Sequence, residues 1–265
     1  MNLQLQDKKA IVTGGSRGIG KAIARQLARE GCDVAICARN EGALRESAEE
    51  LAGETGRKIV PILCDTMNAE AIKAFVRRAA GELGGIHIVI NSAARVSGTP
   101  GTIETVNDID VLRDFEEKVV GYLRCAQAAL PYLKQAGWGR IINISGGAGR
   151  TPGIQVSAGI RNIGTVNLTK SMANLLGPFG INVNAVYPGF TLTEARAADF
   201  TKESERTGKT VEELMKQAAE VTTIKRLVAA EDIANLVAFL CSPLAAGING
   251  EAIAINGGAS ADVHY

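Results

Sequence analysis

The chain has little of the residues that mark several protein classes. Of its 265 residues, 4% are aromatic, two are histidines and five are cysteines. The cysteines are scattered and odd in number, which indicates reduced thiols in a cytoplasmic protein rather than a disulfide framework. His87 and His264 are too few for a histidine-rich metal site, so we expect no metal.

An excess of charge of one sign is also missing. The 29 basic and 28 acidic residues nearly cancel, and such a chain lacks the electrostatic footprint of nucleic-acid or membrane-surface binding. No apolar run approaches the roughly 20 residues that a membrane helix needs. The stretch Met1–Asp7 lacks the basic start and apolar core of a signal peptide. We therefore expect neither nucleic acid nor membrane as a partner.

The chain alternates short apolar runs with longer helical patterns. The runs are apolar nearly throughout, as in strands buried on both faces of a parallel sheet. They cover Lys9–Thr13, Asp33–Cys37, Ile59–Cys64, Ile86–Asn91, Arg140–Ser145, Ile181–Val186 and Ala252–Ile255. The helical patterns lie near 18–30, 41–53, 68–83, 108–135, 158–177 and 230–241. This predicts an α/β fold: one Rossmann-type domain over 1–265, with a doubly wound parallel sheet of about seven strands and helices on both faces.

One polar segment, 192–226, interrupts this alternation after the sixth predicted strand. Thr210 and Glu213 have the spacing of a capping box, so a helix is expected to start there, with Gly208 as a turn before it. Ligands of such folds bind at the carboxyl edge of the sheet. We therefore interpret the segment as a lid over the substrate, the alternative being a surface excursion without a catalytic part.

A glycine-rich motif, Thr-Gly-Gly-Ser-Arg-Gly-Ile-Gly over 13–20, follows the first predicted strand and opens the first helix. Glycines permit a tight turn and a close approach of a pyrophosphate, and the helix N-terminus offers free N–H groups. The motif therefore predicts a dinucleotide site. Its candidate binding residues are Gly14, Ser16, Arg17, Gly18, Ile19 and Gly20.

Four elements of the chain together resemble the short-chain dehydrogenase/reductase family over essentially its whole length. The family's TGxxxGxG is met by Thr13, Gly14, Gly18 and Gly20, and its NNAG is similar to Asn-Ser-Ala-Ala over 91–94. Its PGxxxT is similar to the stretch from Pro188, and its closing ITGQ…DGG to 248–258. The resemblance implies a homo-oligomer, a tetramer or dimer, and further cofactor residues: Asn91, Ala93, Pro188, Gly189, Thr191 and Thr193.

The end of the second predicted strand bears on the choice of cofactor. An acid there would bind a ribose 2′-OH and repel a 2′-phosphate, but this chain has Arg39 and no acid. Arg39 and Arg17 suit a phosphate, so we predict NADP(H) in preference to NAD(H). Asp65 matches the family position that touches the adenine amino group. The alternative is that Asp65, or its rival Thr66, merely caps a helix.

The family's catalytic residues are replaced. Its YxxxK pair falls on Ala158 and Asn162, and its supporting Asn falls on Lys118. The exchange keeps one amine and one amide in the pocket, so we expect Lys118 and Asn162 to be catalytic; the alternative is that Lys118 points to solvent. The usual catalytic Ser falls on Gly146. We add Ser145 as a catalytic candidate, because its loop can present N–H groups to an oxyanion.

Other side chains near the expected site are weaker candidates for proton transfer or anion binding. They are Tyr122, Arg95, Arg150 and Arg161, and Arg161 has a subunit-interface salt bridge as its plainer interpretation. A buried lysine can have a depressed pKa and act as a general acid or base. Lys118 and Ser145 therefore both stay candidates for the proton donor, and the sequence does not decide which group replaces the Tyr.

The resemblance and the replaced residues leave three functions open. The first is NADP(H)-dependent oxidation or reduction of a small-molecule alcohol or carbonyl through a non-standard site. The second is a different reaction on the same scaffold: an enone or imine reductase, or a lyase or isomerase. The third is a non-catalytic NADP(H)-binding sensor or partner subunit, because a fold does not dictate a function.

Overall fold

The computed structural model describes residues 2–95, 98–151 and 155–260, and His264 lies outside them. One seven-stranded sheet has the order β3-β2-β1-β4-β5-β6-β9, and all its pairs are parallel. The strands are β1 (Lys9–Thr13), β2 (Asp33–Ala38), β3 (Ile59–Leu63), β4 (Ile88–Asn91), β5 (Gly139–Ile144), β6 (Ile181–Pro188) and β9 (Ala252–Ile255). The strand order reverses between β1 and β4, where open α/β sheets bind ligands.

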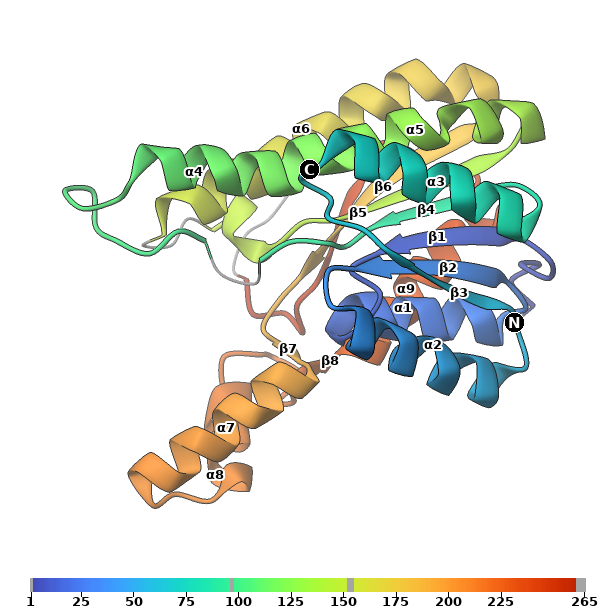
Figure 1. Ribbon diagram of the computed structural model, residues 1–265. Helices are drawn as coiled ribbons and strands as arrows, with labels where there is room; N and C mark the ends of the chain where they lie inside the picture. The colour runs from blue at the N-terminus through green and yellow to red at the C-terminus, as the bar shows by residue number, and fades with distance from the viewer. Residues whose placement is uncertain (1, 96–97, 152–154, 261–265) are drawn as a thin grey trace.

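Helices cover both faces of this sheet (Figure 1). One face carries α1 (Gly18–Arg29), α2 (Glu41–Thr55) and α9 (Ala230–Cys241). The other carries α3 (Ala69–Leu83), α5 (Gly121–Ala136) and α6 (Val156–Leu176). Three short 3-10 turns complete the sheet connections, at Gly147–Gly149, Gly177–Phe179 and Pro243–Ala245. The predicted Rossmann-type fold is confirmed, with strand ends that differ by at most two residues.

The predicted helix over 108–135 is divided. It consists of α4 (Asp108–Phe115), a π-helical turn η1 (Glu116–Val120) and α5. The turn buries three consecutive residues, Glu117, Lys118 and Val119. π-turns inside helices are rare and are frequent at functional sites. The hydrophobic pattern over 108–135 predicted one continuous helix, and the π-turn within it was not predicted.

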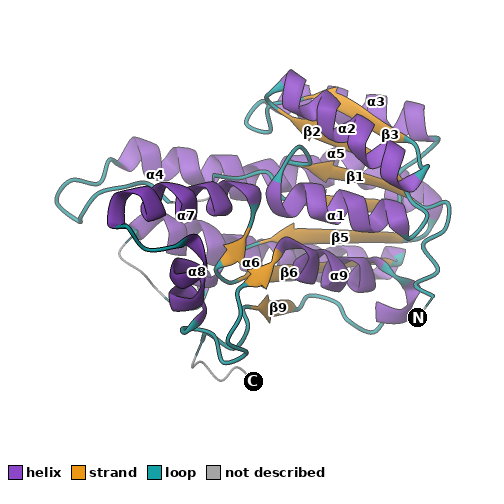
Figure 2. Cartoon of the chain, turned by 90° about the horizontal axis from the view of Figure 1, so that it is seen from below, coloured by secondary structure: helices purple, strands orange, loops and turns teal. Residues whose placement is uncertain are grey.

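The segment 192–226 forms two helices, α7 (Glu194–Thr207) and α8 (Val211–Ala219). They lie beyond the carboxyl ends of the strands, at the same end of the molecule as α4 (Figure 2). A small parallel pair, β7 (Thr191–Leu192) with β8 (Val228–Ala229), brackets them. Thr210 and Glu213 form the predicted capping box, and Gly208 ends α7 with φ of 73°. The role of this segment as a lid stays a prediction.

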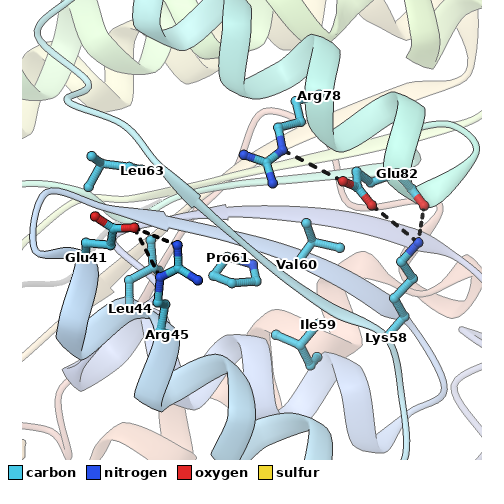
Figure 3. A pocket seen from close by; sticks show the side chains of 10 residues that line it. All are labelled: Glu41, Leu44, Arg45, Lys58, Ile59, Val60, Pro61, Leu63, Arg78 and Glu82. Atoms are coloured by element: carbon cyan, nitrogen blue, oxygen red, sulfur yellow. Dashed lines mark hydrogen bonds and ion pairs between the residues drawn. The ribbon is translucent and has the colours of Figure 1, made fainter.

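A pocket of about 370 Å³ lies beside the edge strand β3, between α2 and α3 (Figure 3). Its charged side chains already pair with one another. Arg45 Nη2 lies 2.7 Å from Glu41 Oε1, and Lys58 Nζ lies 3.7 Å from Glu82 Oε2. Because the pocket shares no residue with the glycine-rich loop or with Lys118, we do not treat it as the functional site.

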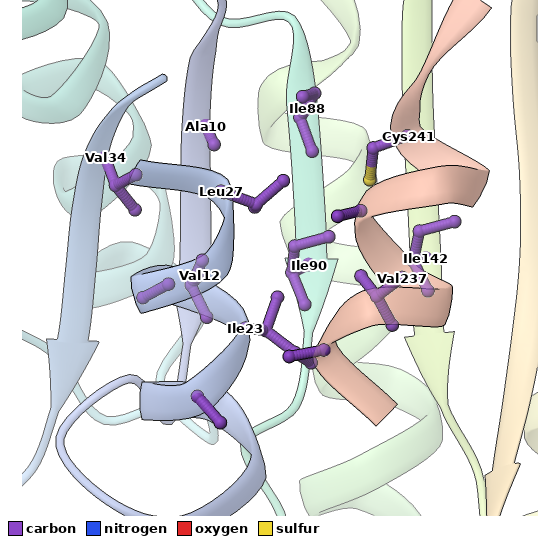
Figure 4. Close-up of a cluster of buried hydrophobic side chains, with 14 of the residues drawn as sticks. Ala10, Val12, Ile23, Leu27, Val34, Ile88, Ile90, Ile142, Val237 and Cys241 are labelled. Atoms are coloured by element: carbon purple, nitrogen blue, oxygen red, sulfur yellow. The ribbon is translucent and has the colours of Figure 1, made fainter. Parts of the chain in front are cut away.

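The core between α1, α9 and the sheet is fully closed. Ile23 and Leu27 of α1 face the strands and Val237 of α9, and none of the three exposes any surface (Figure 4). Burying a leucine side chain contributes roughly 1.5–3 kcal/mol. This packing fixes α1, and with it the loop that precedes α1, against the sheet.

We expect Leu27→Ala to lower the free energy of unfolding by about 2–5 kcal/mol, because it removes buried methyl groups and leaves a cavity. Urea unfolding followed by circular dichroism measures the loss. The matched control is Leu63→Ala, since Leu63 is 56% exposed; its effect is expected within about 0.5 kcal/mol. Equal losses in the two variants would contradict this account of the core.

Candidate active site

The glycine-rich loop lies tightly against its neighbours at the point where the strand order reverses. Gly14 has φ of 71°, and a Cβ there would lie 3.0 Å from Ala93 Cα. A Cβ at Gly20 would collide with the carbonyl oxygen of Gly14. Gly15 N donates to Cys37 O at the end of β2, over 3.1 Å. The loop therefore needs glycine at 14 and 20, and it brings the α1 N-terminus next to the end of β2.

The N-terminus of α1 already holds an anion. Gly18 N donates to Glu194 Oε2 of α7 over 3.0 Å, and a Cβ at Gly18 would lie 3.6 Å from Thr193 Cγ2. Free N–H groups and the helix dipole favour negative charge at this point. The carboxylate of Glu194 thus occupies a place that suits a phosphate oxygen, so the loop fits a dinucleotide pyrophosphate.

The rest of the predicted loop residues lie around this point. Arg17 is the exposed N-cap residue of α1, and Ser16 O accepts from Ser47 Oγ over 2.7 Å. Ile19 is partly buried against the core on the α1 side of the sheet. The side chain of Arg17 is therefore available to a ligand, whereas Ser16 and Ile19 mainly anchor the loop.

The predicted adenosine side is lined from three elements. Arg39, after β2, is 60% exposed, and its Nη1 lies 3.6 Å from Glu117 Oε1. Asp65 is exposed and accepts from Met67 N over 3.0 Å, while Thr66 is buried. The side chain that caps α3 is Asn68, so the interpretation of Asp65 or Thr66 as that cap is wrong.

Asn91 lies in the core at the end of β4. It exposes no surface, and its Nδ2 donates to Asn143 Oδ1 over 2.9 Å. Asn143 donates in turn to Thr169 Oγ1 over 2.9 Å. Asn91 therefore joins β4 to β5 and reaches α6 through Asn143. Its side chain supports the sheet edge on which a cofactor would lie.

The stretch after β6 is held by its own hydrogen bonds. Pro188 ends β6 beside Ile255 of β9, and a Cβ at Gly189 would lie 2.7 Å from Asn256 Cα. Thr191 Oγ1 donates to Gly189 O over 2.9 Å, and the Thr193 side chain caps α7. These residues lead from the sheet edge to Glu194 and so connect α7 to the glycine-rich loop.

Lys118 is the centre of the predicted catalytic group. It is 5% exposed, so the alternative that it points to solvent is wrong. Its Nζ donates to Asn162 Oδ1 of α6 over 2.7 Å and to Ser145 O after β5 over 3.0 Å. Ser145 Oγ donates to Asn162 O over 3.0 Å. The structure therefore brings the three predicted residues together in one hydrogen-bonded cluster.

Burial changes the acidity of the Lys118 amine. Loss of hydration disfavours the ammonium form, and the nearby charge of Arg161 acts in the same direction. The charge of Asp114 opposes both, and the resulting pKa is about 7. Near neutral pH this side chain is therefore present in both its ammonium and its amine forms, as a general acid or base requires.

Asn162 fits only because two neighbouring residues lack side chains. A Cβ at Gly146 would lie 2.8 Å from Asn162 Nδ2, and a Cβ at Gly149 would lie 3.0 Å from Asn162 Cβ. Among the described residues, Asn162 Nδ2 has no hydrogen-bond acceptor. The glycine at 146, where the family has its usual Ser, thus makes room for the amide that contacts Lys118.

The place next to Ala158 is filled by the chain itself. A Cβ at Gly98 would lie 2.8 Å from Ala158 Cβ. Thr99 N donates to Ser157 Oγ over 2.6 Å and to Asp114 Oδ2 over 2.9 Å. Hydrogen bonds thus hold the loop after β4 directly against the position at which the family has its Tyr.

The weaker candidates have other roles. Tyr122 Oη donates to Ile144 O over 3.1 Å, and burial raises the pKa of its phenol. Arg161 is buried, and its Nη1 lies 3.4 Å from Asp114 Oδ1 of the same chain. The ion pair that the structure describes for Arg161 is therefore within one subunit. Arg150 stacks on Tyr187 at 4.3 Å and donates to Ala252 O over 2.7 Å. Of these residues, only Arg161 affects the pKa of Lys118, which its positive charge lowers.

Three acidic residues near the site were missed by sequence reasoning: Asp114, Glu117 and Glu194. Asp114 and Glu117 belong to a helix that is otherwise typical of an amphipathic surface helix, where acids normally face solvent. Glu194 follows a threonine N-cap, where an acid is ordinary. No signal in the sequence distinguishes these acids from solvated ones.

The described residues contain no group of three His, Cys, Asp or Glu side chains arranged to hold a metal ion. In the same residues, no helix has the length and apolar character needed to cross a membrane.

The fold and the glycine-rich loop together define a dinucleotide-binding α/β protein.

Comparison with known proteins identifies the family. A family model described as enoyl-(acyl carrier protein) reductase matches residues 14–260. The 3-oxoacyl-[acyl-carrier-protein] reductase FabG of Aquifex aeolicus is 34% identical over 263 residues, which is 97% of this chain and 99% of the relative. The short-chain reductase protein NovJ of Streptomyces niveus is 33% identical over 257 residues, or 96% and 94%. The chain belongs to the short-chain dehydrogenase/reductase family, and these relatives are oxidoreductases.

Solved structures agree with this assignment. L-sorbose reductase from Gluconobacter frateurii, in complex with NADPH and L-sorbose, has a TM-score of 0.94 at 27% identity and covers 99% of this chain and 100% of its own. A short-chain dehydrogenase from Burkholderia cenocepacia in complex with NADP has a TM-score of 0.82 at 32% identity, with coverage of 97% and 99%. The cofactor form in both neighbours is the one predicted here from Arg17 and Arg39.

We expect that Ala158→Tyr will not restore the chemistry of a Tyr-dependent relative. The ring would have to displace Gly98 and break the hydrogen bonds of Thr99, so the variant should be less stable by about 1–3 kcal/mol, as overpacked cores are. Thermal unfolding and a reductase assay measure the two effects. The matched control is Asn174→Tyr on the exposed side of α6. A gain of activity with unchanged stability would contradict the described position of the loop.

Proposed function

We propose that the protein is an NADP(H)-dependent oxidoreductase that acts on the carbonyl or alcohol of a small molecule through Lys118, Asn162 and Ser145. The observation that carries the proposal is the Lys118 amine, held between Asn162 Oδ1 and Ser145 O with a pKa of about 7. Bound NADPH supplies the hydride. The chain must then provide a proton and a polarised pocket for the substrate oxygen.

Lys118 is the proposed source of the proton. Its ammonium form is a stronger acid than an ordinary lysine by the shift from 10.5 to about 7, so it releases a proton at neutral pH. After release, the neutral amine keeps a hydrogen bond to each of its two acceptors. The buried site therefore needs no rearrangement when the proton leaves, which suits a preorganised catalytic group.

Asn162 is the proposed contact for the substrate oxygen. Its Oδ1 is fixed by Lys118, so Nδ2 is aimed at the space that the missing side chain of Gly146 leaves. An amide N–H there is suited to donate to a carbonyl oxygen that gains negative charge. Ser145 acts by position, since its hydroxyl holds the main chain of Asn162 and its carbonyl holds Lys118.

The cofactor would lie along the sheet edge from Arg39 to Thr191. The glycine-rich loop and the α1 N-terminus would hold its pyrophosphate, and Arg17 and Arg39 its 2′-phosphate. The carboxylate of Glu194, which accepts a hydrogen bond from Gly18 N, supports this placement. We further propose that Asp65 lies near the adenine and that α7 and α8 cover the substrate.

An apolar groove of about 430 Å³ supports an oligomer. It lies between α4, η1 and α6, and Ile160 and Ile163 are 46% and 51% exposed there. Exposed apolar patches of this kind mark interaction surfaces. We propose a homo-oligomer, a dimer or tetramer, that covers this groove, and we keep the cytoplasm as its proposed location.

We expect Lys118→Leu to lower cofactor-dependent turnover by at least about 100-fold, because it removes the proton donor. Turnover is measured with NADPH on a panel of carbonyls, enones and imines, and circular dichroism checks the fold. The control is Lys73→Leu on the exposed side of α3. Full activity of Lys118→Leu would contradict the proposal. NADPH binding without any turnover by the unaltered protein would favour the non-catalytic function.

The pH dependence of reduction should follow the Lys118 amine. Because reduction uses the ammonium form and the pKa is about 7, kcat/KM is expected to be maximal below pH 7 and to fall about tenfold per pH unit above it. Oxidation of the alcohol uses the amine and should rise over the same range. Steady-state rates between pH 5 and 9 test this. A falling limb that persists in Lys118→Leu would assign the proton to another group.

A further inference from the structure

Glu117 is a buried carboxylate that the proposed mechanism does not use. It lies on the π-turn η1, directly before Lys118, and is 3% exposed. Its Oε2 has no hydrogen-bond donor among the described residues. A buried carboxylate oxygen without a hydrogen-bond donor lowers the stability of the folded protein. We therefore expect Glu117 Oε2 to have a donor in some other state of the protein.

Two arginines approach this carboxylate from different strands. Arg39 comes from the end of β2, with Nη1 3.6 Å from Oε1, and Arg95 follows β4, with Nε 3.4 Å from Oε2. Both distances exceed that of a good charge-assisted hydrogen bond, about 2.7–2.9 Å. Arg39 and Arg95 are 60% and 40% exposed. The arginines are therefore held loosely by Glu117 and can still turn toward a ligand.

These three residues lie on the proposed adenosine side of the site. The glycine-rich loop contacts the end of β2, since Gly15 N donates to Cys37 O. The loop after β3 contacts the start of α5, where Arg124 Nη1 donates to Met67 O over 2.8 Å. Glu117 is four residues before Gly121, whose Cβ would lie 3.2 Å from Thr66 O. The ends of β2, β3 and β4 thus meet η1 at this place.

We propose that Glu117 limits the preference for NADPH over NADH by competing with the 2′-phosphate for Arg39. Without cofactor, Arg39 lies against the Glu117 carboxylate. NADPH offers a second anion to the same guanidinium, whereas NADH does not. Binding of NADPH therefore has to draw Arg39 away from Glu117, and Glu117 weakens NADPH binding relative to NADH. This inference rests on the proposed function only in requiring that the dinucleotide binds at this edge.

The test is direct binding of NADPH and NADH, followed by nicotinamide fluorescence, without any assay of turnover. Glu117→Gln keeps the shape of the side chain and removes its charge. We expect its Kd for NADPH to fall three- to tenfold while its Kd for NADH changes less than twofold. An unchanged ratio of the two Kd values overturns the competition.

A second pair of variants separates competition from simple repulsion. In Arg39→Ala the phosphate has lost its guanidinium, so adding Glu117→Gln should change the ratio less than twofold. If Glu117→Gln tightens NADPH binding as much in Arg39→Ala as in the unaltered protein, the carboxylate acts on the phosphate directly and the proposal is wrong. Thermal unfolding checks that each variant is folded.

Arg95→Ala gives an independent measurement should Glu117→Gln fold poorly. Arg95 lies near the same carboxylate as Arg39. Without Arg95, Glu117 pairs with Arg39 alone and attracts it more strongly. Kd for NADPH should therefore rise two- to fivefold, with Kd for NADH unchanged. No change in either value contradicts the proposal.

Glu194→Gln is the matched control for the loss of a carboxylate at the cofactor site. Glu194 occupies the α1 N-terminus, a place common to both dinucleotides, so its removal should change both Kd values by the same factor. A changed ratio in this variant would show that the ratio does not report on Arg39. If the unaltered protein binds neither dinucleotide, the proposed function and this inference both fail; if it binds NADPH and only the ratios disagree, the inference alone fails.

Discussion

The structure at the carboxyl edge of the sheet depends on the burial of one amine. A buried ammonium or amine is tolerated only where its N–H groups find acceptors. Lys118 finds two, the carbonyl of Ser145 and the side-chain oxygen of Asn162. Asn162 can reach it only because Gly146 and Gly149 lack side chains. The identities of residues 118, 146, 149 and 162 are therefore consequences of a single requirement.

Two charged residues near that amine form a buried pair. Arg161 and Asp114 lie side by side on α6 and α4, with a separation of 3.4 Å between Nη1 and Oδ1. Burial acts to raise the pKa of Asp114, but hydrogen bonds from Ser157 and Thr99 and the charge of Arg161 hold it below its ordinary value. Arg161 and Asp114 act on Lys118 in opposite directions. Because the effect of Arg161 is the larger of the two, the surrounding charges add to burial in lowering the pKa of the amine.

The fold followed from the sequence because strands buried on both faces leave continuous apolar runs, and the glycine-rich loop has a fixed place between β1 and α1. The contact of Lys118 with Asn162 followed from the resemblance, since the exchange of two residue types in facing positions preserves their pairing. Glu117, Glu194 and the Gly98 loop did not follow. Their positions depend on a π-turn, on the placing of α7 and on a loop path, and none of these leaves a periodic or compositional trace.

The hydrogen bond between Lys118 and Asn162 also restricts how such a site can arise. A chain that begins with Asn at 118 and Lys at 162, as the family resemblance implies, can exchange them only through one of two intermediates. One would hold two buried amines against each other, at a high electrostatic cost. The other would hold two amides and no amine, a neutral pair that packs readily. Single substitutions therefore favour a route on which the amine is lost first and regained on the opposite helix. Such a route passes through an ancestor that has asparagine at both positions and no buried amine at this site.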